Sequence, residues 1–262
     1  MFQYLYSTFF YEPVLNLLVF LYNISPGHDL GIAIILLTLV IKIILLPLSK
    51  KSLKSQKALQ ELQPKIEEIK RKFKNKKEEM SRAMMSLYKE NKVNPFSSCL
   101  PLIIQLPFLL AVFRVFRNGF NNSSLDLVYS FINKPEVINS ISLGFVDLSA
   151  KNNIYLAVAA GLAQFWQTKM MMTKRPAKKT PGAKDEDMMA IMNKQAMYFM
   201  PLLTVFIAYT FPAGLALYWL TTTLLTVFQQ LYIFKKEPIS DTKNLKLPEK
   251  ENKTIKGEII KK

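Results

Sequence analysis

The chain has 262 residues, half of them hydrophobic, and a formal net charge of +16 at pH 7. Its apolar and basic residues fall in separate, alternating blocks, a pattern typical of an integral membrane protein and unusual in a soluble domain. One cysteine, one histidine and no GxxxxGKS/T, GxSxG, HExxH or CxxC motif argue against an enzyme, a disulfide framework, a metal site and any cofactor.

Residues 1–29 contain no Lys or Arg and include an apolar stretch, Phe2–Ile24, that a Glu-Pro pair interrupts at Glu12. The spacing of Glu12, Asn16 and Asn23 places these three residues on one side of a helix. We therefore predict an external amphipathic helix that lies on the membrane surface. A sixth span or an uncleaved signal anchor is the alternative.

Residues 30–48 form the first predicted transmembrane helix, because roughly 20 apolar residues cross the hydrocarbon core. Lys42 is the only charged residue in this block, and a charge there costs roughly 3 kcal/mol on insertion scales. Thr38 lies one helical turn earlier on the same face. Since the predicted spans contain no Asp or Glu, we interpret Lys42 and Thr38 as facing a water-filled cavity. Extension of the Lys42 side chain toward the inner membrane surface is the alternative.

Residues 49–95 are basic, free of glycine and rich in helix formers. Apolar residues recur every three or four positions on both sides of Lys74–Lys77, which predicts an antiparallel helical hairpin with its turn there. A solvated basic linker is the alternative. The apolar positions are Leu59, Leu62, Ile66, Ile69, Phe73, Met80, Met84 and Leu87.

Three further apolar blocks follow in the chain. Residues 96–116 and 152–172 each have the length of one span, whereas residues 195–234 have room for two. Pro212 and Gly214 divide this last block, because both residue types interrupt helices. The later segments are therefore predicted as transmembrane helices at 96–116, 152–172, 195–211 and 213–234, an external loop at 117–151, a cytoplasmic loop at 173–194 and a disordered basic tail at 235–262.

The basic residues outside the spans predict the orientation of the chain. The segments Lys50–Lys92, Lys169–Lys194 and the tail after Phe234 hold 14, 7 and 9 Lys and Arg, whereas Arg117–Lys151 holds 3. Cytoplasmic segments carry the excess of Lys and Arg. The N-terminus is therefore predicted outside and the C-terminus in the cytoplasm.

Polar residues also occur in the other predicted spans. In the last one, Tyr218, Thr222, Thr226 and Gln229 fall at i, i+4, i+8 and i+11, which places them in one stripe along a helix. Together with Lys42 they indicate a shared hydrophilic interior, and ordinary hydrogen bonding between helices is the alternative. The other candidates are Gln105, Gln164, Gln167 and Trp219, which neighbours Tyr218.

The stretch NPFSSCLPLIIQLPFLLAVFRVF (residues 94–116) resembles the second conserved span of YidC-type membrane protein insertases, relatives of the mitochondrial Oxa and plastid Alb insertases. Residues 34–73 are similar to the first conserved span and hairpin arm of that family. LAQFWQTKMM (162–171) and FPAGLALYWLTTTLLTVFQQ (211–230) resemble parts of its third and fifth spans. The likeness covers roughly Leu30–Phe234, with the spans in the expected order.

The resemblance implies an all-α integral membrane protein with five transmembrane helices around a hydrophilic groove, open to the cytoplasm and to lipid but closed outside. It implies an insertase of the bacterial cell membrane that helps nascent membrane proteins enter the lipid bilayer, alone or beside the Sec translocon, without a nucleotide or other cofactor. The basic tail and the hairpin are expected to bind the ribosome, because clustered Lys and Arg attract RNA.

Lys42 occupies the position of the groove's basic residue in this family, where Arg is usual and offers a planar fork that Lys lacks. The large periplasmic domain of Gram-negative members and the lipoprotein cysteine of many Gram-positive members have no counterpart here. A small transporter with Lys42 as an anion site and a membrane scaffold with a polar interior are the alternatives. The predicted client-binding groove contains Lys42, Thr38, Gln105, Gln164, Gln167, Tyr218, Trp219 and Thr222.

Overall fold

A computed structural model describes residues 2–73, 76–94, 100–118, 125–171 and 195–236, and most of them are helical. This confirms the prediction of a mainly α-helical protein. The first elements are α1 (Phe2–Tyr6), the π-helix η1 (Ser7–Tyr11), α2 (Glu12–Ile24), the 3-10 helix η2 (Pro26–His28), α3 (Leu30–Ile44), α4 (Leu46–Lys72) and α5 (Lys77–Glu90). The later elements are α6 (Leu100–Asn118), β1 (Ile141–Ser142), β2 (Val146–Asp147), α8 (Ile154–Met171), the π-helix η4 (Gln195–Phe199), α10 (Met200–Thr210) and α11 (Ala213–Lys236).

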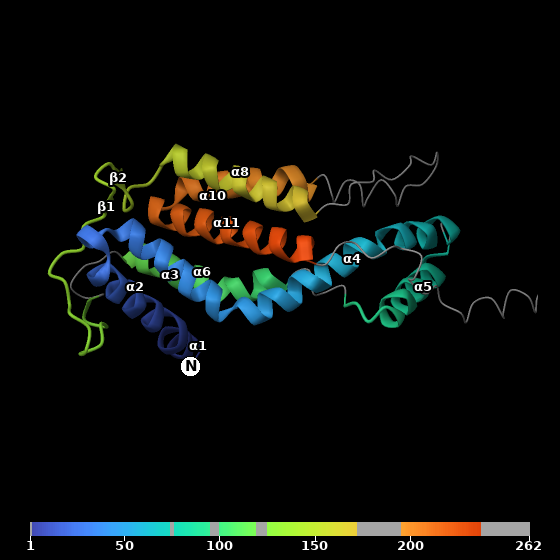
Figure 1. Cartoon of the computed structure of the whole chain (residues 1–262), viewed down its shortest axis with the longest axis horizontal. Helices are drawn as coiled ribbons and strands as arrows, with labels where there is room; N and C mark the ends of the chain where they lie inside the picture. Colours follow the sequence, from blue (N-terminus) through green and yellow to red (C-terminus); the bar gives the residue numbers. More distant parts are fainter. Residues whose placement is uncertain (1, 74–75, 95–99, 119–124, 172–194, 237–262) are drawn as a thin grey trace, which may run out of the picture.

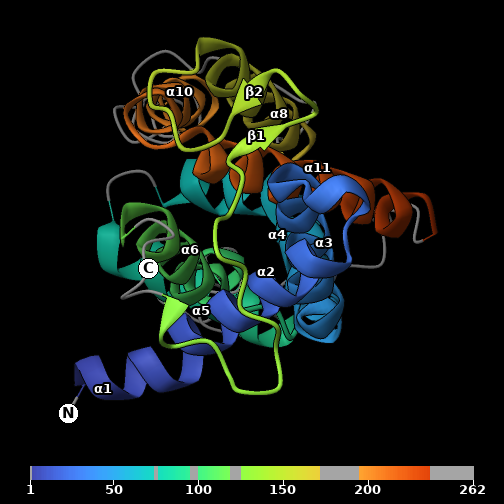
Figure 2. The ribbon, with the colours of Figure 1, turned by 90° about the vertical axis from the view of Figure 1, so that its left-hand side faces the viewer.

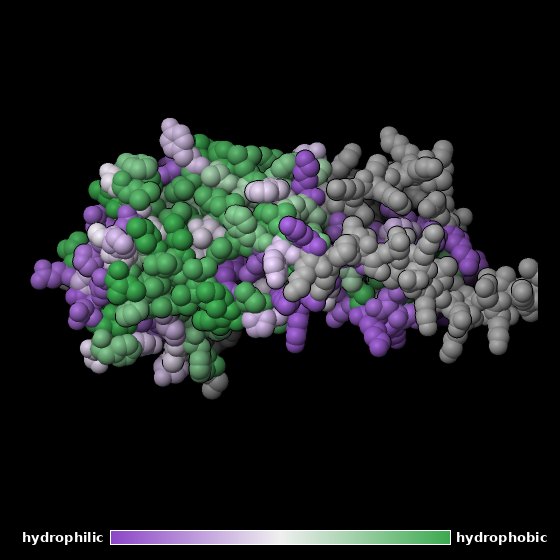
Figure 3. Space-filling model, viewed as in Figure 1, coloured by the Kyte–Doolittle hydropathy of each residue, from purple (hydrophilic) through white to green (hydrophobic). Residues whose placement is uncertain are grey.

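Helices α3, α6, α8, α10 and α11 form an elongated bundle (Figure 1). Helix α11 packs against α8, α3, α10 and α6 and is therefore the common partner of the bundle. The α4–α5 pair projects from one end, and the antiparallel β1–β2 hairpin lies at the other, the end that faces the viewer in Figure 2. The space-filling view shows a mainly hydrophobic surface over the bundle, with hydrophilic side chains toward both ends (Figure 3).

The five predicted spans do not all meet simple length and hydropathy criteria within the described residues. Of the predicted spans, the first meets them only when Leu30–Ile44 and Leu46–Lys70 are taken together as a bent pair, and Met197–Thr210 is a shorter apolar helix. The helix Gln3–Ile24, which lies in the segment predicted as an external surface helix, meets them by itself. Helix α11 is long enough, but its Thr and Gln residues lower its hydropathy. The number of spans therefore stays a prediction.

A sharp bend between α3 and α4 directs α4 away from the bundle. The two helices meet at an angle of 70°, and Leu45 is the residue between them. Pro47 lies at the start of α4 and has no N–H group to donate to the carbonyl of Ile43, so the hydrogen-bond ladder of α3 cannot continue. Helix α3 thus ends at Ile44, four residues before the end of the predicted span.

Helices α4 and α5 pack on each other through an apolar core of their own. The predicted three- and four-residue spacing places these side chains on one face of each helix. Pro64 lies inside α4, which continues through it as one helix. The placement of this helix pair in the cytoplasm stays a prediction. The buried residues of the core are Leu62, Ile66, Ile69, Phe73, Ala83 and Leu87.

The N-terminal helices pack against the bundle, with α2 in contact with α3 and α6. Two of the three polar residues that predicted an amphipathic surface helix, Asn16 and Asn23, bind the loop before β1. Asn16 is 2% exposed, donates to the carbonyl of Leu127 at 3.0 Å and accepts from the N–H of Tyr129 at 2.7 Å. Asn23 donates to the carbonyl of Asn133 at 2.7 Å. The position of this helix on the outer membrane surface stays a prediction.

Asp29 joins the start of α3 to the strand hairpin. One carboxylate oxygen accepts from the N–H of Ile32 at 3.0 Å, as an N-cap does, and from the Ser142 hydroxyl at 2.7 Å. The other accepts from the N–H of Leu143 at 2.6 Å. Although partial burial raises the pKa of the Asp29 carboxyl, these hydrogen bonds outweigh it and hold the pKa below its usual value.

Asp29→Ala is expected to lower the free energy of unfolding by about 1–2 kcal/mol, because the cap and the hairpin bonds are lost together. Asp29→Asn keeps a side-chain acceptor and loses only the charge. Since the folded-state pKa is lowered, the benefit of the charge is complete above the unfolded pKa, about 3.9, and disappears as the pH falls through the folded value. Unfolding in detergent at a series of pH values measures this. A difference between wild type and Asp29→Asn that stays constant down to acidic pH would contradict it.

Gly161 allows α8 and α10 to lie close together. A Cβ atom at this position would collide with Cγ2 of Val205 and lie 3.3 Å from the carbonyl oxygen of Pro201. Small buried residues of α8, α10 and α11 pack together near this position. These are Ala157, Ala160, Ala208 and Ala216.

Gly161→Ala is expected to destabilise the bundle by about 1–3 kcal/mol, because the added methyl group overpacks the contact. Helix propensity alone predicts the opposite sign, a gain of about 1 kcal/mol. Thermal unfolding in detergent distinguishes the two. The double variant with Val205→Ala should regain most of the loss, since it removes the colliding methyl group.

Candidate functional site

The polar stripe on α11 contacts both α3 and α6. Tyr218, Thr222 and Thr226 lie one turn apart on the face of α11 that these helices approach. Phe211 and Pro212 separate α10 from α11, so the stripe begins in the second turn of an uninterrupted helix. The helix is therefore continuous over all positions of the predicted stripe.

Lys42 reaches Thr226 from α3. Its Nζ atom donates a hydrogen bond of 2.8 Å to the Thr226 hydroxyl, which itself donates to the carbonyl of Thr222 at 2.7 Å. The Lys42 side chain is only 8% exposed. An ammonium group has three N–H donors, and among the described residues this hydroxyl is its one hydrogen-bond acceptor. The predicted spans contain no carboxylate partner for Lys42, and the structure places a neutral hydroxyl beside its ammonium group.

Gln105 and Tyr218 form the second contact of the stripe. The amide Nε2 of Gln105 donates to the Tyr218 hydroxyl and so joins α6 to α11. Tyr218 is completely buried, which makes this hydroxyl an internal polar group that needs its partner. The structure thus places Lys42 and Gln105 along one side of α11, with Lys42 at Thr226 and Gln105 about 12 Å away at Tyr218.

The other predicted groove residues are placed differently. The Thr38 hydroxyl is buried and donates to the carbonyl of Ile34 at 2.7 Å, so its proton is used within α3. Gln164 and Gln167 are partly buried on α8, and Trp219 is partly buried beside Tyr218. In the described part of the chain, no hydrogen bond joins these three side chains to Lys42. Their role in a groove stays a prediction.

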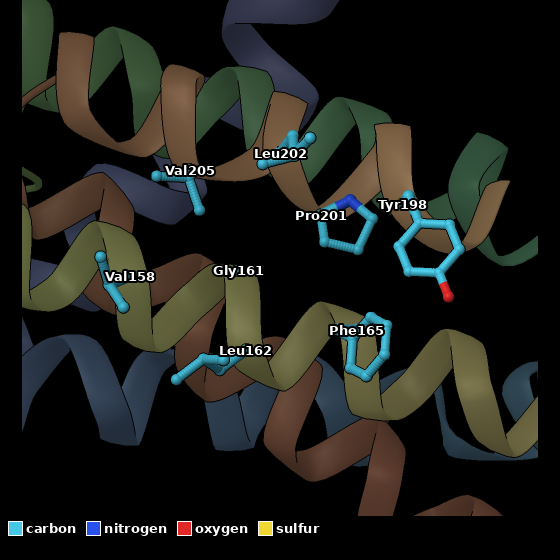
Figure 4. A pocket seen from close by; sticks show the side chains of 8 residues that line it. All are labelled: Val158, Gly161, Leu162, Phe165, Tyr198, Pro201, Leu202 and Val205. Atoms are coloured by element: carbon cyan, nitrogen blue, oxygen red, sulfur yellow. The ribbon is translucent and has the colours of Figure 1, made fainter. Parts of the chain in front are cut away.

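A surface hollow of about 270 Å³ lies apart from the stripe, between α8 and α10 (Figure 4). Phe165 and Leu162 line it from α8, and Leu202 and Tyr198 line it from the facing segment. Its walls are almost entirely apolar, so it has no group that distinguishes a charged ligand. The described residues also contain no cluster of His, Cys, Asp and Glu that could hold a metal ion. The polar chemistry of the α11 stripe is therefore that of hydrogen bonding and the buried ammonium group of Lys42.

Sequence comparison supplies the family. The family model described as "60Kd inner membrane protein" matches residues 20–241. The chain is 36% identical over 231 residues to a protein of Fusobacterium nucleatum named "Membrane protein insertase YidC", and the match covers 87% of the chain and 98% of that relative. The chain belongs to the YidC family.

Other YidC relatives are much longer than this chain. A protein of Geotalea daltonii with the same name is 37% identical over 228 residues, which is 87% of this chain and 37% of the relative. A relative from Syntrophus aciditrophicus is 39% identical over 226 residues, which is 86% of this chain and 36% of the relative. The chain thus spans little more than a third of such relatives. The predicted resemblance is confirmed, and the family indicates a bacterial inner membrane protein.

Proposed function

We propose that the chain is a membrane protein insertase whose client-binding site is the α11 stripe with Lys42 and Gln105 beside it. The observation that carries the proposal is the buried ammonium group of Lys42, which has a single hydroxyl acceptor among the described residues. A buried cation needs further acceptors. The carboxylates or backbone carbonyls of a client's polar tail are acceptors of the required kind.

The proposed mechanism follows from the cost of moving polar groups through lipid. The tail of a client cannot cross about 30 Å of hydrocarbon cheaply. A hydrophilic groove that reaches part of the way shortens this path. Lys42 attracts the tail, and the Gln105–Tyr218 pair exchanges its hydrogen bond for bonds to the client. The client's apolar helix then leaves sideways into lipid, and its burial there supplies the driving force.

The topology and the partners complete the proposal. The excess of Lys and Arg supports an external N-terminus and a cytoplasmic C-terminus. In this orientation the α4–α5 pair receives clients in the cytoplasm. The basic segments attract ribosomal RNA by a salt-sensitive interaction. Cooperation with the Sec translocon rests on the family resemblance alone.

Rescue of an insertase-depleted bacterium tests the function directly. The chain should restore growth and insertion, and nascent membrane proteins should crosslink to a photoreactive residue at Thr222. A scaffold would give no rescue, and a cysteine at Thr222 would not react with aqueous maleimide. A transporter would give solute flux in liposomes without any client. Failure to rescue with a well-expressed protein would contradict the proposal.

A further inference from the structure

A second buried lysine lies where α4 packs against the end of α11. Lys57 is 5% exposed, and its Nζ atom is buried without a hydrogen-bond partner. This ammonium group lies over the ring of Phe234, 5.6 Å from the ring centroid. A cation–π contact satisfies the charge in part but leaves the N–H groups without acceptors.

Unsatisfied acceptors lie on the same part of α11. The Oε1 atoms of Gln229 and Gln230 are buried without hydrogen-bond partners, and Gln230 is 1% exposed. Buried polar atoms without partners are rare in native proteins, and each one calls for an explanation. At this junction a donor and two acceptors are left unsatisfied together.

The junction continues the polar face that Lys42 contacts. Thr226, Gln230 and Phe234 lie at successive intervals of four residues on α11, so they share one face. Lys42 binds the first of them, and Lys57 contacts the last. Eight residues of α-helix separate these contacts by about 12 Å. The two buried lysines therefore lie along one side of α11, with Gln230 between them.

An extended acidic peptide fits the unsatisfied groups of this junction. Its N–H groups donate to glutamine oxygens, and its carbonyls and carboxylates accept from the ammonium group. An inorganic anion supplies acceptors only and leaves the glutamine oxygens unsatisfied.

We propose that Lys57, Gln229 and Gln230 form a second client-binding site, which holds the acidic tail of a client before it reaches Lys42. This inference rests on the proposed insertase function. Lys57 binds the tail at the α4–α11 junction, and Lys42 binds it about 12 Å farther along α11.

Insertion into proteoliposomes tests the site with two clients. They are identical except that the tail of the acidic client has Asp where the tail of the neutral client has Asn. Lys57→Gln should lower insertion of the acidic client roughly fivefold, equivalent to about 1 kcal/mol, and leave the neutral client unchanged. Lys57→Arg should retain insertion. Lys51→Gln is the matched control, because it removes the same charge from an exposed position of α4 and should change neither client.

Crosslinking in the otherwise unchanged protein gives a second readout. Benzoylphenylalanine at Phe234 should capture stalled nascent chains at shorter lengths than a probe at Thr222. Equal loss of both clients in Lys57→Gln would assign Lys57 a purely structural role, and absence of crosslinks at Phe234 would also overturn the proposal. Either result leaves the insertase function standing if the unmodified chain still inserts both clients.

Discussion

Replacing Lys42 by glutamate is expected to lower the insertion of clients with acidic tails roughly tenfold or more. The substitution exchanges an attraction for a repulsion inside a largely buried site. A change of about 1.4 kcal/mol, modest for two charges a few ångströms apart at intermediate dielectric, already gives a factor of ten. Initial rates of insertion into liposomes that contain the purified protein measure this effect.

Matched variants separate the charge of Lys42 from its size. Lys42→Arg should keep most of the activity, because it preserves the cation and its donors. Lys42→Ala should fall between Arg and Glu, and a client with a neutral tail should respond least to all three. Full activity of Lys42→Glu on acidic clients would remove the electrostatic role, although a hydrated stripe on α11 would still be compatible with that result.

Tyr218→Ala is expected to lower the free energy of unfolding by about 3–5 kcal/mol, the range for large buried aromatic side chains. The ring is completely buried between helices, and its loss also leaves the Gln105 amide without its acceptor. Tyr218→Phe should cost about 1–2 kcal/mol, because only the hydroxyl is removed. Unfolding in mixed micelles provides the measurement.

Tyr155→Ala is the control for Tyr218, because Tyr155 is 85% exposed on α8. Its removal should change the free energy of unfolding by less than about 0.5 kcal/mol. Similar losses in the two alanine variants would show that Tyr218 does not pack as the structure places it. Insertion by Tyr218→Phe then tests whether the hydroxyl itself takes part in client binding.

Periodicity within one helix could be predicted from the sequence, whereas the contacts between helices could not. The spacing of Tyr218, Thr222 and Thr226 predicted one polar face. The structure adds that Thr226 is the residue of this face that Lys42 contacts. The shift of one helix along the axis of another depends on the packing of all side chains between them. The spacing of residues within either helix therefore does not predict which residues meet.

The hydrogen-bond partners of polar residues also could not be predicted from the spacing of residues within one helix. Asn16 and Asn23 had the spacing of a water-facing stripe, yet they bind carbonyls of a loop more than 100 residues later in the chain. Lys57 lies in a segment with many exposed lysines. Nothing in the neighbouring sequence distinguishes it from them or predicts its burial. The two-residue strands β1 and β2 are too short for alternation to be visible.

The packing of α3 above Lys42 has a consequence for the electrical resistance of the membrane. Leu30, Ala33, Ile34 and Leu37 are completely buried between Lys42 and the strand hairpin, which Asp29 ties to the helix start. A continuous aqueous path through such a bundle would let protons and sodium ions cross and dissipate the gradients that drive ATP synthesis. In the proposed insertase, these two turns of buried hydrocarbon on α3 would interrupt that path, so a site for a charged peptide would not conduct ions.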